Sequence, residues 1–282
     1  MFRRTESICL KIAMAVILCF VFSQSAYSNI VFAESFNGPA GADLGTSTNA
    51  NWITAFNRQN GGSDNGSASI FGADGSIDKV ANGTSAQNDA GALLALPGGA
   101  LAANSTYTLS ATITNNNNNW TAIGFASSDQ TLDGTNGRHS NGSATTFGGY
   151  AWALTRASSG GNDQEIFGGA GTGNNFLGGD VVNPANPVTF TVILDTTNTA
   201  ALTAEYFFNG ISQGTQTLGP NAFADISFVG ISSDGGSAAD NPNPSTISDF
   251  SLAVKSNAIP EPCSLTLLCA GGLAMLSRRR RV

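Results

Sequence analysis

Two stretches in the middle of this chain alternate strictly between apolar and hydroxyl-bearing residues. In YTLSATIT (residues 107–114) every second residue is apolar, and the residues between them are threonine or serine. VTFTVILD (residues 188–195) starts with the same alternation. Because successive side chains of a β-strand point to opposite faces, each stretch predicts a strand with one face in a core and the other toward solvent. Such strands favour a fold in which sheets pack face to face.

Further short segments of the same kind are separated by Gly, Asn, Asp and Ser, which favour turns. They lie at 30–36, 67–71, 92–96, 120–126, 146–154, 164–167, 201–208, 214–218, 226–231 and 246–254. Asn209-Gly210 stands between two of them and predicts a type I′ hairpin turn, since both central positions of that turn need positive φ. No sustained helical period interrupts the pattern. We therefore predict an all-β domain at residues 29–254, a single β-sandwich or jelly roll.

The N-terminus has the three parts of a secretory signal peptide. Basic residues precede an apolar run at 12–22, and the small-x-small sequence AYS at 26–28 follows it. This order predicts a signal peptide at residues 1–28, with the secretion translocon and signal peptidase as partners. The mature protein would begin at Asn29.

The C-terminus combines a short apolar segment with a cluster of arginines. Residues 263–276 carry no charge, and as a helix they would span about 21 Å, less than the roughly 30 Å of a bilayer core. Arginines that reach into the phosphate layer would offset this deficit and would stay on the cytoplasmic side. These are Arg278, Arg279, Arg280 and Arg281. We predict a transmembrane segment at 263–276, the alternative being a buried or amphipathic helix with a basic tail.

An extended tripeptide, Pro260, Glu261 and Pro262, comes directly before that segment. Proline resists helix formation and holds its predecessor in extended geometry. The order of tripeptide, apolar segment and arginines in residues 259–282 resembles the PEP-CTERM sorting signal of Gram-negative bacteria. The resemblance implies recognition and cleavage by exosortase, a membrane-embedded cysteine protease or transpeptidase. It also implies an exported protein that is anchored in the inner membrane before processing and then lies at the cell surface or outside the cell, with residues 255–258 as a linker.

The predicted body differs from the termini in cysteine content and charge. All four cysteines of the chain lie in the two terminal segments, so no disulfide is expected in the body. Five basic and 17 acidic residues lie between residues 29 and 258, which gives a net charge of −12. This charge disfavours binding to nucleic acid or to anionic lipid headgroups.

Three segments of the body carry a second resemblance. They are FAESFNG at 32–38, LDTTNTAALTAEYFFNG at 194–210 and ISDFSLAV at 247–254. Their arrangement resembles the concanavalin A-like lectin/glucanase sandwich, including LamG-like modules. The resemblance implies that the first and last strands pair and that a curved inner sheet lies beneath loops. This superfold hosts lectins, glycosidases and structural domains, so it does not settle function.

Acidic residues are the first candidates for catalytic groups. Asp163 and Glu165 share a strand face, but no third acid follows them, which favours a solvated pair over the carboxylate dyad of a glycosidase. Glu34 and Glu205 stand alone within strands, where we expect outward-facing polar positions. The one histidine, His139, lies in a loop sequence. The one Gly-x-Ser-x-Gly pattern, at residues 210–214, begins in the predicted hairpin turn between two strands and not at the strand-to-helix turn of a nucleophile elbow. We therefore predict a protein that is not an enzyme, with no catalytic residues.

Calcium is the one cofactor for which the sequence offers ligands. Asp129, Asp133 and Asn136 carry hard oxygens, but their spacing misses that of an EF-hand loop. Another glycine-rich region contains Asp64, Asp74 and Asp78. Turn formation explains these Asp and Asn residues without a metal, so we expect no metal site.

Four aromatic residues are candidate platforms for sugar rings: Trp52, Trp120, Tyr150 and Trp152. Trp120 and Trp152 lie in strand patterns, which favours the core. The sequence thus predicts a noncatalytic scaffold or adhesion protein of the cell surface or extracellular matrix, associated with exopolysaccharide. The alternative is a carbohydrate-binding, lectin-like protein, and a glycoside hydrolase is a distant third.

Overall fold

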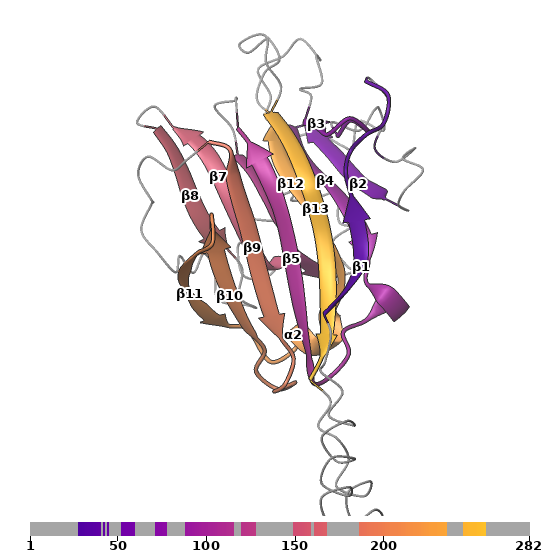
Figure 1. Ribbon diagram of the computed structural model, residues 1–282, viewed down its shortest axis with the longest axis vertical. Helices are drawn as coiled ribbons and strands as arrows, with labels where there is room; N and C mark the ends of the chain where they lie inside the picture. Colours follow the sequence, from indigo (N-terminus) through magenta and orange to yellow (C-terminus); the bar gives the residue numbers. More distant parts are fainter. Residues whose placement is uncertain are drawn as a thin grey trace, which may run out of the picture. The chain divides into compact units, whose positions relative to one another are not determined.

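The computed structural model describes the greater part of the body of the chain (Figure 1). The described residues are 28–40, 42, 44, 52–59, 71–77, 88–115, 120–127, 149–158, 161–167, 186–235 and 245–257. Almost all of them belong to one compact unit, Ser28–Lys255. The described residues exclude 1–27, which belong to the predicted signal peptide, and 258–282.

Two β-sheets form this unit. The larger sheet has the order β1 (Asn29–Glu34), β13 (Ser245–Ser256), β5 (Ser105–Thr114), β9 (Val188–Asp195), β10 (Thr203–Phe208) and β11 (Ile211–Thr217), and β3 (Ser76–Ile77) also pairs with β13. The smaller sheet has the order β2 (Ile53–Gln59), β4 (Asn88–Ala95), β12 (Ile226–Gly235), β6 (Trp120–Ser127), β7 (Gly149–Ser158) and β8 (Gly161–Phe167). Figure 1 shows the larger sheet in front of the smaller one. Two one-turn helices, η2 (Pro97–Gly99) and α2 (Ala222–Asp225), connect strands.

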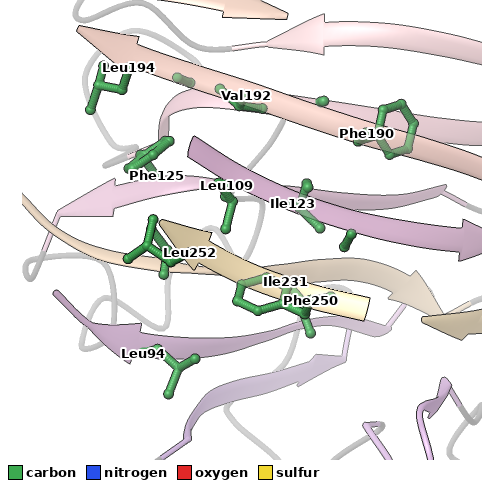
Figure 2. Close-up of a cluster of buried hydrophobic side chains, with 14 of the residues drawn as sticks. Leu94, Leu109, Ile123, Phe125, Phe190, Val192, Leu194, Ile231, Phe250 and Leu252 are labelled. Carbon is green, nitrogen blue, oxygen red and sulfur yellow. The ribbon is translucent and has the colours of Figure 1, made fainter. Parts of the chain in front are cut away.

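The main core lies between the sheets. β5 and β9 alternate between buried and half-buried residues along their whole length, as the sequence predicts. Leu109 and Phe190 from the larger sheet and Ile123 from the smaller one belong to one buried cluster (Figure 2). The prediction of an all-β sandwich is therefore confirmed.

A second, smaller apolar cluster is formed by residues that point to the other face of the smaller sheet. Along β7, Ala151 and Ala153 belong to the main core, whereas Trp152 and Leu154 between them belong to the second cluster. Its other members are Leu93, Ala122 and Ala126, with Phe228 packed against them. Strands buried on both faces read as continuous apolar runs, so the alternation of one apolar and one solvated face does not apply to this sheet.

Two topological predictions are also confirmed. β1 pairs with β13, so the first and last strands of the domain are neighbours. Asn209 and Gly210 connect β10 to β11 with φ values of 49° and 78°, both positive as a type I′ turn requires.

Four elements were missed, and most of the predicted strands begin or end one to four residues away from the observed bounds. The missed elements are β2, β3, η2 and α2. β2 contains a register shift between Thr54 and Phe56, which breaks the two-residue period that sequence reasoning looks for. Of the predicted strand at 67–71, only Phe71 is described, in an isolated bridge to Ile77. β13 continues to Ser256, beyond the predicted strand end at 254.

Candidate functional site

The outer surface of the larger sheet carries rows of hydroxyl side chains. They come from the half-buried positions of β5 and β9, which alternate with the core residues. We call this surface the hydroxyl face, formed by Thr106, Thr108, Ser110, Thr112, Thr114, Thr189 and Thr191. Its members face outward and are half-buried, since the other face of β5 and β9 fills the core.

Cross-strand hydrogen bonds orient the hydroxyl groups. The register of β5 and β9 places Ser110 opposite Thr191 and Thr112 opposite Thr189. Ser110 Oγ donates to the Phe190 carbonyl oxygen at 2.9 Å and lies 3.2 Å from Thr191 Oγ1. Because a serine hydroxyl has one proton, Thr191 is the donor in the second contact. Thr112 Oγ1 and Thr189 Oγ1 are 2.9 Å apart.

An aromatic side chain borders the hydroxyl face. Phe207 of β10 is paired with Thr191 and is half-buried. Ile193 lies two residues along β9, opposite Glu205. The Glu205 carboxylate accepts a hydrogen bond from Ser212 Oγ at 2.8 Å. Among the described outward positions of β5 and β9, the one charged residue is Asp195, at the end of β9. The outward surface of β5 and β9 is therefore polar and almost uncharged, and β10 borders it with Phe207 and with the Glu205 carboxylate.

The prediction for Glu34 was wrong, whereas that for Glu205 was right. Glu34 is only 2% exposed and faces the same side as the buried Phe250, with which it is paired. Its Oε1 accepts a hydrogen bond from the backbone N–H of Phe36 at 2.9 Å. Phe36 has a φ of 52°, so the carboxylate supports a left-handed turn that directly follows β1. A buried polar group that is hydrogen-bonded in this way costs much less than a free one.

The aromatic residues weighed as platforms for sugar rings lie in the core wherever their side chains are described. Trp152 is fully buried, which confirms the core prediction, and Tyr150 is 7% exposed. The Tyr150 hydroxyl donates to the Asp225 carboxylate. Trp52 packs edge-on against Phe250, with ring centroids 5.1 Å apart. Trp120 is the first residue of β6, and its side chain lies outside the described part.

Phe207 is the aromatic residue that sequence reasoning missed. The signal was present in TAEYFF, because Phe207 has the phase of Thr203 and Glu205 rather than that of the buried Tyr206. An aromatic in the outward phase of an amphipathic strand is a candidate for contact with a ligand.

Of the acidic residues weighed as possible calcium ligands, Asp74 is the one that is described. Its Oδ1 accepts hydrogen bonds from the Ser76 hydroxyl at 2.6 Å and from the Ser76 backbone N–H at 3.1 Å. The hydroxyl bond is the main cause that lowers the pKa of Asp74 below its usual value. Within the described ranges, no group of three or more His, Cys, Asp or Glu residues could hold a metal ion. Asp64, Asp78, Asp129, Asp133 and Asn136 lie outside those ranges.

The remaining predicted residues are described in part or not at all. Asp163 and Glu165 are on β8, opposite Arg156 and Leu154, and their side chains are outside the described part. His139 is not among the described residues, nor are Pro260, Glu261, Pro262, the 263–276 segment and Arg278, Arg279, Arg280 and Arg281. In the portion of the chain that the structure describes, no helix is long and apolar enough to cross a membrane.

The described residues thus define an antiparallel two-sheet sandwich with a polar, nearly uncharged outer face. No protein-family model and no curated protein matches this chain. A search of solved structures finds distant matches. One, from work on endo-acting O-glycanases with which human gut bacteria initiate mucin breakdown, is 10% identical and covers 81% of this chain and 99% of its own, with a TM-score of 0.45.

Two further similar structures are lectin domains. The carbohydrate recognition domain of Emp47p is 10% identical and covers 84% of this chain and 100% of its own, with a TM-score of 0.41. Lectin II from Ulex europaeus is 13% identical and covers 82% and 100%, with a TM-score of 0.42. At TM-scores below 0.5 these matches carry no argument about this chain, so its function must be argued from its own residues.

Proposed function

We propose that this chain is an exported, transiently membrane-anchored and noncatalytic protein of the cell surface or extracellular matrix. The observation that carries the proposal is the pairing of Asn29 with Val254, in the first and last strands. The chain enters and leaves the sandwich at neighbouring points. A domain of this kind can be inserted between an N-terminal export signal and a C-terminal anchor without any change in its own strand pairing.

The position of the predicted sorting signal is consistent with this arrangement. β13 ends at Ser256, and three residues, 257–259, separate it from Pro260. In the sequence, the tripeptide therefore follows closely after the last described strand. The prolines at 260 and 262 favour an extended conformation, which would leave the tripeptide accessible to exosortase just outside the membrane.

A test of the sorting proposal separates recognition from anchoring. An epitope tag in the body reports the size and membrane partition of the protein in hosts with and without exosortase. Changing Pro260, Glu261 and Pro262 to Ala keeps the apolar segment and the arginines, so the precursor is expected to insert and stay uncut. Changing Arg278 through Arg281 to Ala removes the orienting charge, so the precursor is expected to insert poorly.

Two outcomes would contradict the sorting proposal. The first is equal processing of the wild-type protein and the tripeptide variant. The second is processing that persists in the host without exosortase. Either result would mean that the C-terminus is a basic tail and not a sorting signal.

The noncatalytic part of the proposal rests on the placement of the acids. Glu34 supports a turn and Glu205 is bonded to Ser212, so neither faces a second carboxylate in the contacts described here. We expect no hydrolysis of glucans, galactans or chitin by the body. Any trace activity should stay unchanged when Asp163 and Glu165 are both changed to Ala. A measurable turnover that either substitution abolishes would overturn this part.

A second candidate function is carbohydrate binding. The hydroxyl face with Phe207 beside it favours this candidate, because ligand surfaces for sugars combine oriented polar groups with an apolar contact. The two candidates are compatible, since an anchored surface protein can hold a polysaccharide.

A further inference from the structure

We propose that the hydroxyl face binds one extended, uncharged polysaccharide strand. The proposal deepens the carbohydrate-binding candidate and rests on it. The face is formed by central strands of the larger sheet and not by connecting loops, so its geometry is set by β-strand pairing.

The length of the face fits a chain and not a single sugar. Along β5 hydroxyl residues occur at every second position from Thr106 to Thr114. Hydroxyls two residues apart in a strand are about 6.8 Å apart, so this row is roughly 27 Å long. A second row on β9 lies about 4.8 Å away. A ligand that uses both rows must be extended and must repeat its own polar groups.

Four of the hydroxyl groups, at the middle of the face, are oriented before any ligand arrives. Ser110 donates to the Phe190 carbonyl oxygen and accepts from Thr191, so the direction of both protons is fixed. Thr112 and Thr189 bond to each other, which leaves one proton and several lone pairs for an outside partner. Threonine is also stiff at χ1. Because little side-chain entropy remains to be lost, even modest hydrogen bonds to sugar hydroxyls can yield net affinity.

Phe207 supplies the apolar part of the contact. It is half-buried, and its register partner Thr191 belongs to the hydroxyl face. A sugar ring has one face of C–H groups, which packs against an aromatic ring while the hydroxyls at its edge reach the threonines.

The charge of the protein selects an uncharged polymer. The body has a net charge of −12 by sequence, and the described outward positions of β5 and β9 carry only Asp195 as a charged group. A polyanion would be repelled and would meet no cation there. A second protein copy fits less well, since the core of a protein interface is rich in aromatic and apolar residues, whereas this face is mostly threonine.

The test uses the full chain in mild detergent and measures binding to insoluble polysaccharides. The neutral probes are cellulose, β-1,3-glucan and mannan, and the anionic probe is alginate gel. The variant Thr112→Val with Thr189→Val removes two hydroxyls and keeps the branched shape. Phe207→Leu removes the ring and keeps an apolar residue. Thr199→Val, at an exposed turn between β9 and β10, is the matched control.

We expect the wild-type chain and the Thr199→Val control to bind a neutral probe equally, and alginate weakly. The double variant and Phe207→Leu should each bind about tenfold more weakly, which corresponds to the loss of one or two hydrogen bonds or of a ring contact. Unchanged far-UV circular dichroism spectra establish that the variants are folded. If the double variant is unfolded, the binding of Phe207→Leu decides the test.

Contrary outcomes separate this inference from the functions on which it rests. If the wild type binds a neutral probe and the folded variants bind it equally well, the inference is wrong and the ligand lies elsewhere on the protein. If the wild type binds none of the neutral probes, the inference and the carbohydrate-binding candidate both fail. Preferential binding to alginate, or self-association that the double variant abolishes, would also overturn the inference. None of these outcomes alters the sorting experiment.

Discussion

Trp152 of β7 lies against Gly124 of β6, its partner in the strand register. A Cβ atom on Gly124 would collide with the Trp152 ring and with the carbonyl oxygen of Ala151. Gly124 is therefore required by close packing, which lets the largest side chain of the second apolar cluster lie against the sheet. The same holds for Gly230, where a Cβ would meet the Leu93 side chain and the Ala92 carbonyl oxygen.

The first prediction concerns this contact. Gly124→Ala should lower the free energy of unfolding by about 1–3 kcal/mol, the usual cost of overpacking. Urea denaturation of the body, residues 29–257, measures it. Gly99→Ala is the control, since nothing lies within 4 Å of its added Cβ although its φ is 74°, and it should cost only about 1 kcal/mol. A smaller loss for Gly124→Ala than for Gly99→Ala would show that the cluster repacks freely.

The sequence predicted one layer of this sandwich better than the other. In the larger sheet, one face is buried and the other is half-exposed, so the alternation in β5 and β9 identified both strands and their core residues. In the smaller sheet, Trp152 and Ala153 are both buried although they point to opposite faces. A periodicity argument assumes a solvated face, and it therefore could not assign Trp152 to a second cluster.

The candidate site was predictable only in part. Alternation shows that Thr112 and Thr189 face outward, but it does not show that they are opposite each other, since register depends on pairings that are distant in sequence. The prediction for Glu34 was wrong for a related reason. Its phase within β1 was visible, but the turn at Phe36 that its carboxylate supports is a backbone feature with no sequence period.

The second prediction concerns Tyr206, whose hydroxyl donates to Gln216 Oε1 at 3.0 Å inside the core. Burial raises the pKa of Tyr206 well above its usual value. A raised folded-state pKa means that stability is fully present below the unfolded pKa, about 10, and falls as the pH rises above it. The urea midpoint should therefore fall between pH 9 and pH 11.

Tyr206→Phe is the matched variant for this test. It should cost about 1 kcal/mol at pH 7, because one buried hydrogen bond is lost. Above pH 10 its midpoint should fall less steeply than that of the wild type. If the urea midpoints of the two proteins fall equally steeply with pH, Tyr206 does not contribute to alkaline unfolding.

The third prediction concerns acid stability. The pKa of Asp74 is lowered by the Ser76 hydroxyl bond, the largest contribution. A lowered folded-state pKa means that the stabilisation is present above the unfolded pKa, about 3.9, and is lost as the pH falls through the folded value. Asp74→Asn should therefore reduce the difference in melting temperature between pH 7 and pH 3, as should Ser76→Ala. An unchanged difference in both variants would contradict this prediction.

The fourth prediction concerns Thr196, which joins the two strands that carry the hydroxyl face. Thr196 is fully buried directly after β9. Its Oγ1 accepts a hydrogen bond from the Ser105 backbone N–H at 2.9 Å and lies 2.6 Å from the Ala102 carbonyl oxygen, to which it donates. Ser105 begins β5, so these bonds tie the start of β5 to the end of β9 and help to fix their register.

Thr196→Val keeps the shape of the side chain and removes the hydroxyl, which leaves the Ser105 N–H without this buried acceptor. The expected loss is about 1–3 kcal/mol in the free energy of unfolding. Thr196→Ser keeps the hydroxyl and loses one methyl group, so it should cost only about 1 kcal/mol. Urea denaturation of the body distinguishes the two variants. If Thr196→Val unfolds at the same urea concentration as Thr196→Ser, the hydroxyl bonds contribute nothing beyond packing, and the register of β5 and β9 must be fixed by their backbone pairing alone.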